Sequence, residues 1–199
     1  MLYKIIDIRE VSEAELAETF DNMDENRKER CLRYKFDEDK RRMIAGEYLA
    51  KKLAKEILGT AKEDISLINL ESGQPVILIK DKKLCVSISH SGSFAAAAVS
   101  STPVGIDIEE TRDVPQGVVR KAFSQDEIDF VNSAQTEEEK KQRFLRIWTA
   151  KEAYLKLKGT GLKGLDEAFV LPFVLGEERE NLGFQTFVCK DYVCSLFNS

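Results

Sequence analysis

Two long helical segments, each closed by a glycine, constrain the fold of this chain more than any other feature of its sequence. The first covers residues 40–58 and is followed by Gly59, and its apolar side chains recur with a period near 3.6, at Ile44, Leu49, Leu53 and Ile57. The second ends near Lys158, and Gly159-Thr160-Gly161 breaks it. Each half of the chain therefore contains one long helix.

Short segments with strand character accompany each helix. In the first half we expect strands at residues 1–9, 65–70, 76–79, 84–89 and 94–100, and in the second half at 104–109, 184–188 and 192–197. Ser12 and Ser124 are each followed three residues later by a glutamate, Glu15 and Glu127, which predicts helix N-termini with capping boxes.

The repeated order of elements predicts an α+β fold made of two similar lobes in a pseudo-twofold arrangement. Each lobe would be a small, mainly antiparallel sheet packed on a long helix. We expect the boundary near Ser101-Thr102-Pro103, which gives an N-terminal lobe of residues 1–101 and a C-terminal lobe of residues 102–199.

Charge and composition exclude several classes of function. The formal net charge of −5 argues against general nucleic-acid binding, because proteins that neutralise many phosphates are usually basic. From Arg27 to Arg42, however, eight Lys or Arg residues accompany four Asp or Glu, so this segment suits a small polyanion. No signal peptide, membrane span or zinc-ligand spacing is visible, and a cytoplasmic location with four reduced cysteines is the simplest interpretation.

The sequence Gly-Ile-Asp-Ile-Glu at residues 105–109 places two carboxylates on one face of a strand. Residues two apart in a strand point to the same side, so Asp107 and Glu109 project together while the isoleucines enter the core. A hard cation such as Mg²⁺ would offset the repulsion between them. A solvated face of an edge strand is the other interpretation, and this pattern alone leaves both open.

The sequence Trp-Thr-Ala-Lys-Glu-Ala-Tyr-Leu-Lys at residues 148–156 places Glu152 and Lys156 on one helical face. An exposed ion pair explains this spacing as well as a functional site does. Trp148 lies one turn earlier on the same face, and its bulk favours a face that packs against other groups.

A third stretch brings Ser89 and His90 to the edge of a strand, before a Ser-Gly turn. Hydroxyls, turn N–H groups and an imidazole can all donate to phosphate oxygens, although His90 as an ordinary polar turn residue is about as good an interpretation. The Gly-x-Ser-x-Gly elbow, the Walker loop and the dinucleotide-binding glycine pattern are absent from the sequence.

In this combination and order, the three stretches resemble the phosphopantetheinyl transferase superfamily. Its members have a Gly-(Val/Ile)-Asp-(Ile/Val)-Glu strand and a later Trp-(Ser/Thr)-x-Lys-Glu-(Ala/Ser)-x-x-Lys helix, which match residues 105–109 and 148–156. Residues 89–92 and the basic segment ending at Arg41-Arg42 add to the match, which fades after Leu171. The length is similar to the larger, surfactin-synthetase-activating type, which implies a monomer with its active site in a cleft between the lobes.

The resemblance implies transfer of 4′-phosphopantetheine from coenzyme A to a serine of an acyl or peptidyl carrier protein, with release of 3′,5′-ADP. Asp107, Glu109 and Glu152 would surround Mg²⁺ on the coenzyme A pyrophosphate. Glu152 would also accept the proton of the carrier serine, and Lys156 would neutralise charge on the leaving phosphate. Fatty-acid, polyketide, peptide and lysine-pathway carriers all remain open.

By the same resemblance, coenzyme A contacts are expected from a set of residues in the first half and from Lys156. The set comprises Arg27, Arg30, Arg42, Gly73, Gln74, Pro75, Ser89 and His90. The arginines would reach the 3′-phosphate. Gln74 departs from the family, which often has lysine there, and this loses a charge near the ligand. Glu127 matches an acidic position near the family's site, although its capping role alone explains it.

A basic and apolar segment from Thr111 to Phe123 is expected to dock the carrier protein, because it suits an acidic helix with an apolar stripe. A plain connecting loop with core side chains is the alternative. Two other functions share these motifs: a non-catalytic coenzyme A or nucleotide-binding module, and a metal-dependent pyrophosphate hydrolase that needs no protein acceptor.

Overall fold

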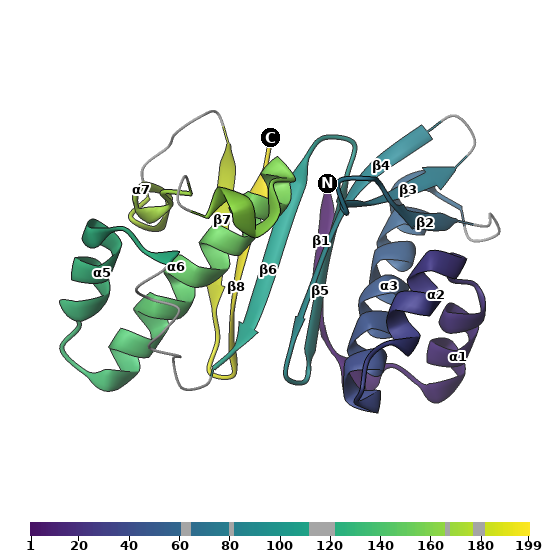
Figure 1. The fold of residues 1–199 in the computed structure, drawn as a ribbon, viewed down its shortest axis with the longest axis horizontal. Helices are drawn as coiled ribbons and strands as arrows, with labels where there is room; N and C mark the ends of the chain where they lie inside the picture. The colour runs from purple at the N-terminus through teal and green to yellow at the C-terminus, as the bar shows by residue number, and fades with distance from the viewer. Residues whose placement is uncertain (61–64, 80–81, 112–121, 166–167, 177–181) are drawn as a thin grey trace. The chain divides into compact units, whose positions relative to one another are not determined.

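The computed structural model of the chain describes residues 1–60, 65–79, 82–111, 122–165, 168–176 and 182–199. It divides into two compact units, Met1–Val104 and Gly105–Ser199 (Figure 1).

The first unit is a five-stranded antiparallel sheet with a long helix on one face. The strand order is β1-β5-β4-β3-β2, with bounds β1 (Leu2–Asp7), β2 (Ser66–Asn69), β3 (Pro75–Ile79), β4 (Lys82–Ser91) and β5 (Phe94–Ser100). The long helix α3 (Asp37–Leu58) buries Leu49 and Leu53 against Val86 and Val99 of the sheet. The smaller elements η1 (Ile8–Glu10), α1 (Glu13–Asp21) and α2 (Glu25–Leu32) complete the unit, and Figure 1 shows α1 and α2 beside α3.

Small residues let α3 lie close to this sheet. Strand β5 contains four consecutive alanines, all fully buried. On α3, a methyl group added at Gly46 would lie 2.6 Å from Cγ2 of Ile88 in β4, which is closer than ordinary van der Waals contact.

The second unit is a three-stranded sheet covered by its own long helix. The strand order is β6-β8-β7, with bounds β6 (Val104–Glu110), β7 (Gly183–Val188) and β8 (Tyr192–Asn198). The long helix is α6 (Glu137–Lys158), and the shorter helical elements are α5 (Gln125–Asn132), η2 (Gly161–Gly164) and α7 (Leu171–Val174). Figure 1 shows α6 crossing one face of the sheet, with α5 and α7 farther from the strands.

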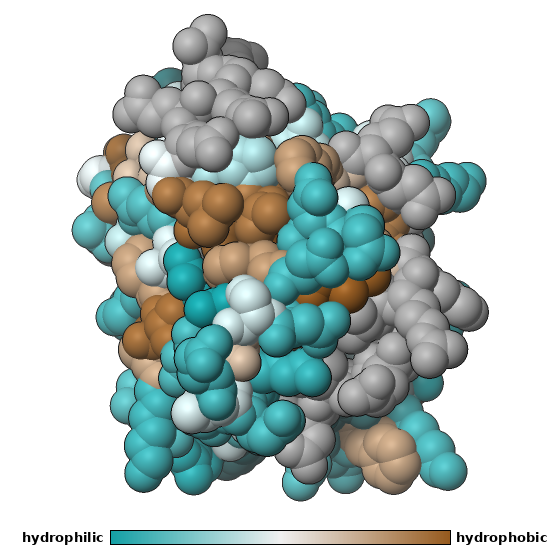
Figure 2. Space-filling view, turned by 90° about the vertical axis from the view of Figure 1, so that its left-hand side faces the viewer, coloured by the Kyte–Doolittle hydropathy of each residue, from teal (hydrophilic) through white to brown (hydrophobic). Residues whose placement is uncertain are grey.

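Aromatic side chains form the centre of the second core. The ring of Phe197 lies 4.6 Å from that of Phe184, 5.0 Å from that of Phe173 and 5.5 Å from that of Tyr154, measured between centroids. The edge-on geometry of two of these pairs is the one that the ring quadrupoles favour. Figure 2 shows apolar side chains grouped on the face that carries α5 and α7, where Phe169 and Leu175 are exposed.

The strand β6 and the helix α6 approach each other more closely than side chains allow. A Cβ atom added at Gly105 in β6 would lie 1.9 Å from the carbonyl oxygen of Ala153 and 2.6 Å from the backbone nitrogen of Leu157. Both obstacles are backbone atoms of α6, so rotation of a side chain cannot relieve the contact. Glycine is therefore required at this position of the strand.

The structure confirms the α+β class and most of the predicted elements. Both predicted capping boxes are present, at Ser12 and at Ser124, and both long helices end at glycines with positive φ, Gly59 at +64° and Gly159 at +72°. The helices α2 and α7 were not predicted, because both are too short to show a clear apolar period. Strand β4 runs through Ser91, so His90 lies in a strand and the turn is Gly92-Ser93.

The four cysteines are free thiols, and Cys189 and Cys194 do not face each other across the β7–β8 hairpin, since Cys194 pairs with Phe187. Burial, and then the charge of Asp107, raise the pKa of the Cys194 thiol.

Within the described residues, no helix combines the length and the apolar character needed to cross a membrane.

The close approach at Gly105 predicts a large effect of a single methyl group. We expect Gly105→Ala to lower the free energy of unfolding of the second unit by about 3 kcal/mol or more, because α6 has to move off the strand. The single tryptophan, Trp148 in α6, reports this transition by fluorescence during urea titration. Gly46→Ala is the matched control. It adds the same methyl group against Cγ2 of Ile88, a side-chain atom that shifts at less cost than backbone does, and alanine also favours the helix. A loss smaller than that of Gly105→Ala, about 2 kcal/mol or less, is expected by circular dichroism. Equal effects of the two variants would contradict this account.

Candidate functional site

The contact at Gly105 determines which side chains meet in the second unit. Asp107 lies two residues farther along β6, so it projects to the same side as Gly105, toward α6. The residues of α6 that Gly105 touches, Ala153 and Leu157, are each preceded in sequence by a charged residue, Glu152 and Lys156. The two motifs found in the sequence therefore meet at this crossing.

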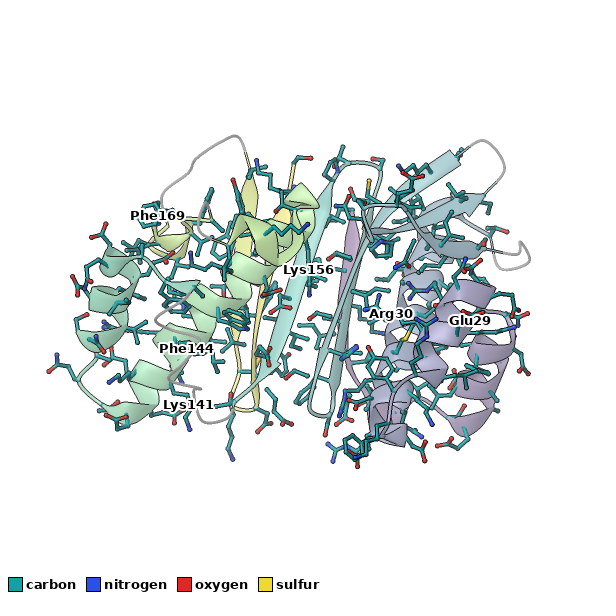
Figure 3. The ribbon with its side chains drawn as sticks, in the orientation of Figure 1. Glu29, Arg30, Lys141, Phe144, Lys156 and Phe169 are labelled. Carbon is teal, nitrogen blue, oxygen red and sulfur yellow. The ribbon has the colours of Figure 1, made fainter. Side chains whose placement is uncertain are left out.

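Asp107 and Lys156 form the central contact of the site. Asp107 is 4% exposed, and its Oδ1 lies 2.7 Å from Nζ of Lys156. The same ammonium group donates to the carbonyl oxygen of Ile106 at 3.2 Å. Figure 3 shows Lys156 on the side of α6 that faces β6. The lysine thus pairs with an acid from the other motif, as well as sharing a helical face with Glu152 as predicted.

The acids Glu109 and Glu152 lie within electrostatic range of this pair. Burial, followed by the charge of Asp107, raises the pKa of Glu152, with Glu109 adding to the increase and Lys156 opposing it. Both glutamates are half-buried. The structure therefore brings three carboxylates and one ammonium group together, with a net negative charge when all are ionised.

The donor set fits a hard divalent cation. Carboxylate oxygens from a strand and a helix are the ligands that Mg²⁺ takes, usually together with substrate phosphates. Among the described residues, no three His, Cys, Asp or Glu side chains are arranged as ligands of one metal ion, and Lys156 holds the oxygen of Asp107. The residues thus fit the ion by type, although their side chains are not arranged as its ligands in this structure, and Lys156 supplies the nearby positive charge.

A second charged pair, Glu127 and Lys151, is buried behind the site. Glu127 is fully buried and Lys151 is 2% exposed, with Nζ of the lysine 3.0 Å from Oε2 of the glutamate. Glu127 also accepts from the backbone N–H groups of Ser124 at 2.8 Å and Val170 at 3.2 Å, and Lys151 donates to the carbonyl of Ala168. Glu127 is therefore both a helix cap and the anchor that ties α5, α6 and residues 168–170 together. The sequence showed the cap but gave no signal for the pairing with Lys151.

In the first unit, the predicted phosphate ligands fall on two faces of the sheet. Ser89 is buried and His90 is half-buried, and as neighbours in β4 they point to opposite sides. Arg42 of α3 lies at the adjacent β4–β5 turn, where it donates to the carbonyl of Gly92 at 3.0 Å and to Asp39 at 2.6 Å.

The other two predicted arginines lie on α2 and differ in exposure. Arg30 is exposed on the surface of the helix (Figure 3), whereas Arg27 is 6% exposed and its Nε lies 2.7 Å from Oε2 of Glu47 in α3. Arg27 also donates to the side chain of Asn69, at the end of β2. The turn at residues 71–73 follows β2. It ends at Gly73, which has a φ of +86°, and after Gln74 the strand β3 begins at Pro75.

The predicted docking segment lies mostly outside the described residues, which omit 112–121. The structure does describe the residues at the two ends of this segment. The backbone N–H of Thr111 donates to the carbonyl of Asp191 at 2.9 Å, and Phe123 is buried with its ring stacked on that of Phe144 at 5.2 Å between centroids. Phe123 is thus a core residue of the second unit. Trp148 is half-buried and packs at the edge of the same core.

Comparison with known proteins decides the family. The sequence model of the 4′-phosphopantetheinyl transferase superfamily matches residues 103–197, and the model of the 4′-phosphopantetheinyl transferase N-terminal region matches residues 10–102. The 4′-phosphopantetheinyl transferase Sfp of Bacillus subtilis (strain 168) is 30% identical over 162 residues, which cover 81% of this chain and 71% of Sfp. The chain belongs to the 4′-phosphopantetheinyl transferase superfamily. The family predicted from the motifs is therefore confirmed, and it is a family of enzymes.

Two other members of the superfamily have a similar sequence identity to this chain. The 4′-phosphopantetheinyl transferase psf-1 of Bacillus pumilus is 34% identical over 130 residues, which cover 65% of this chain and 55% of psf-1. The 4′-phosphopantetheinyl transferase HetI of Nostoc is 31% identical over 143 residues, which cover 69% of this chain and 60% of HetI. The chain thus spans little more than half the length of some relatives and about 70% of Sfp.

The buried pair behind the site predicts a strong stability effect that is partly reversible. Lys151→Met should lower the free energy of unfolding of the second unit by about 3–5 kcal/mol, because it leaves the Glu127 carboxylate buried without its cation. The double variant Glu127→Gln with Lys151→Met should recover a large part of that loss, since it removes both charges. Trp148 fluorescence during urea unfolding measures each value. Lys163→Met, at an exposed lysine of the same unit, is the control and should change the value by about 0.5 kcal/mol or less. Additive losses in the double variant would contradict the pairing.

Proposed function

We propose that this protein transfers the 4′-phosphopantetheine group from coenzyme A to a serine of an acyl or peptidyl carrier protein, in a Mg²⁺-dependent reaction that releases 3′,5′-ADP. The observation that carries the proposal is the meeting of Asp107, Glu109, Glu152 and Lys156 at the β6–α6 crossing, in the two motifs of the superfamily. The relatives named above as 4′-phosphopantetheinyl transferases support the same reaction.

The acids are assigned to the metal and to the proton. Asp107, Glu109 and Glu152 would hold Mg²⁺, which when bound supplies positive charge for the pyrophosphate of coenzyme A. Glu152, which is half-buried on the helix, is assigned to accept the proton of the carrier serine, directly or through one water. The hydroxyl oxygen then attacks the phosphorus that bears pantetheine, and 3′,5′-ADP leaves.

Lys156 is assigned to the leaving group. Its ammonium group is already held among the acids by Asp107 and by the carbonyl of Ile106, so it needs little rearrangement to donate to a phosphate that gains charge. Fixed positive charge in a half-buried position acts more strongly than the same charge in water. Positioning and electrostatics therefore supply most of the proposed catalysis.

Coenzyme A itself is proposed to contact the first unit. Arg30 and Arg42 would serve the 3′-phosphate, Ser89 and His90 the other phosphates, and the Gly73-Gln74-Pro75 segment the nucleotide. The proposal assigns carrier docking to the segment from Thr111 to Phe123, and it leaves the pathway of that carrier open among fatty-acid, polyketide, peptide and lysine pathways.

The transfer is tested by intact mass spectrometry of an apo carrier protein incubated with the enzyme, Mg²⁺ and coenzyme A. The carrier should gain the mass of one phosphopantetheine. Glu152→Gln should slow the reaction by about 100-fold or more, because it removes both a ligand and the proton acceptor. Lys156→Met should slow it by a similar factor. Glu138→Gln, at an exposed acid of the same helix, is the control and should leave the rate unchanged.

The alternatives give different results in the same assay. Binding of coenzyme A without a mass gain on any of several acyl and peptidyl carriers would favour a non-catalytic binding module. Release of free phosphopantetheine without an acceptor would favour a hydrolase. Either result would overturn the proposed transfer.

A further inference from the structure

A buried chain of polar contacts in the first unit runs from α3 to the turn after β2. It starts at Glu47 of α3, which is fully buried and receives two cations, Nε of Arg27 at 2.7 Å and Nζ of Lys51 at 2.9 Å. Arg27 comes from α2 and is itself 6% exposed. Two helices are therefore joined through one buried carboxylate.

The chain continues through Asn69 to the turn. Arg27 donates through Nη1 to the side-chain oxygen of Asn69, and the side-chain nitrogen of Asn69 donates to the carbonyl of Gly73 at 3.1 Å. Asn69 also pairs with Pro75 across the β2–β3 ladder. One amide side chain thus links the buried arginine to Gly73, the last residue of the turn, which leads through Gln74 to Pro75 at the start of β3.

The oxygen and the nitrogen of the Asn69 side-chain amide have different tasks. Its oxygen satisfies a charged group that is removed from water, which a buried arginine requires. Its nitrogen holds the carbonyl of Gly73 in a turn that is also closed by the backbone bonds from Leu70 N to Gln74 O at 2.9 Å and from Gly73 N to Leu70 O at 2.8 Å. The backbone N–H of Gln74 also donates to the hydroxyl oxygen of Ser72 at 3.4 Å. The second task concerns the shape of the turn and does not concern the buried charge.

A buried ion pair contributes little net stability compared with apolar residues of the same size. One reason why a protein retains such a pair is that it fixes the geometry of the groups around it. Here the pair ends at an exposed turn, since Glu71, Ser72 and Gly73 are all exposed. The low exposure of Arg27 and its engagement with Glu47 and Asn69 also leave it poorly placed to meet an anion that arrives from solvent.

We propose that Arg27, Glu47 and Asn69 are positioning residues that hold the Gly73-Gln74-Pro75 segment in the shape that binds coenzyme A. Arg27 acts on the ligand through Asn69 and the turn, and it does not contact the 3′-phosphate. This inference rests on the proposed use of coenzyme A by this protein.

Two asparagine variants separate the tasks of the amide. Asn69→Asp keeps an oxygen for Arg27 and loses the donor to Gly73, so stability should remain close to that of the unchanged protein while the Kd for coenzyme A rises about tenfold. Asn69→Ala loses both contacts without adding charge, and should raise the Kd as much while also lowering stability. Asn26→Asp, the same substitution at an exposed position of α2, is the control and should change neither quantity. Isothermal titration calorimetry and circular dichroism provide the two measurements.

A coenzyme A analogue without the 3′-phosphate tests the role of Arg27. If Arg27 acts through the turn, Arg27→Met should weaken coenzyme A and 3′-dephospho-coenzyme A by the same factor. If it binds the 3′-phosphate, only coenzyme A should be affected, and the inference is wrong. An Asn69→Asp variant that binds coenzyme A as well as the unchanged protein does would also overturn it.

These measurements need no carrier protein, so they separate this inference from the proposed reaction. An unchanged protein that binds coenzyme A but transfers nothing would contradict the proposed reaction and leave the positioning result standing. An unchanged protein that does not bind coenzyme A would overturn both, because the turn would then have no such ligand.

Discussion

The backbone contact between Gly105 and α6 is the constraint on which the rest of the second unit depends. Because no Cβ intervenes, the carbonyl of Ala153 and the N–H of Leu157 lie against the strand itself. At that separation an acid two residues along the strand comes within hydrogen-bond distance of a lysine on the helix, as Asp107 and Lys156 show. One methyl group at residue 105 would separate the groups whose proximity defines the site.

Within the helix motif at residues 148–156, neighbouring charged residues have different roles. Lys151 points into the core, where Glu127 and the carbonyl of Ala168 neutralise and satisfy it, while Glu152 and Lys156 lie on the side that meets β6. Burial makes the first pair costly to break, and it fixes the rotation of α6 about its axis. That rotation keeps Glu152 close to the two acids of β6, and burial, followed by repulsion from these acids, raises the pKa of Glu152.

The first unit also has a buried charged residue close in sequence to an exposed one. Arg27 belongs to a basic segment whose composition suits a polyanion, yet its guanidinium is directed inward to Glu47 and Asn69, whereas Arg30, three residues later, is exposed on the same helix. In both units a buried charged residue, Lys151 in one and Arg27 in the other, anchors a helix that also carries predicted ligands. Charged residues in a functional motif therefore fall into two groups, those assigned to bind the ligand and those that stabilise the fold around it.

The sequence by itself determined the family, the α+β class, both capping boxes and the ends of the long helices, because these depend on local patterns of a few residues. Spacing along each element paired Asp107 with Glu109 and Glu152 with Lys156, and the resemblance to the superfamily joined the two pairs into one site. Only the tertiary structure decided that Lys156 pairs with Asp107, that Glu127 pairs with Lys151, and that Arg27 is buried. Those facts follow from contacts between residues 20 to 49 positions apart, and spacing along one element carries no information about what packs against it.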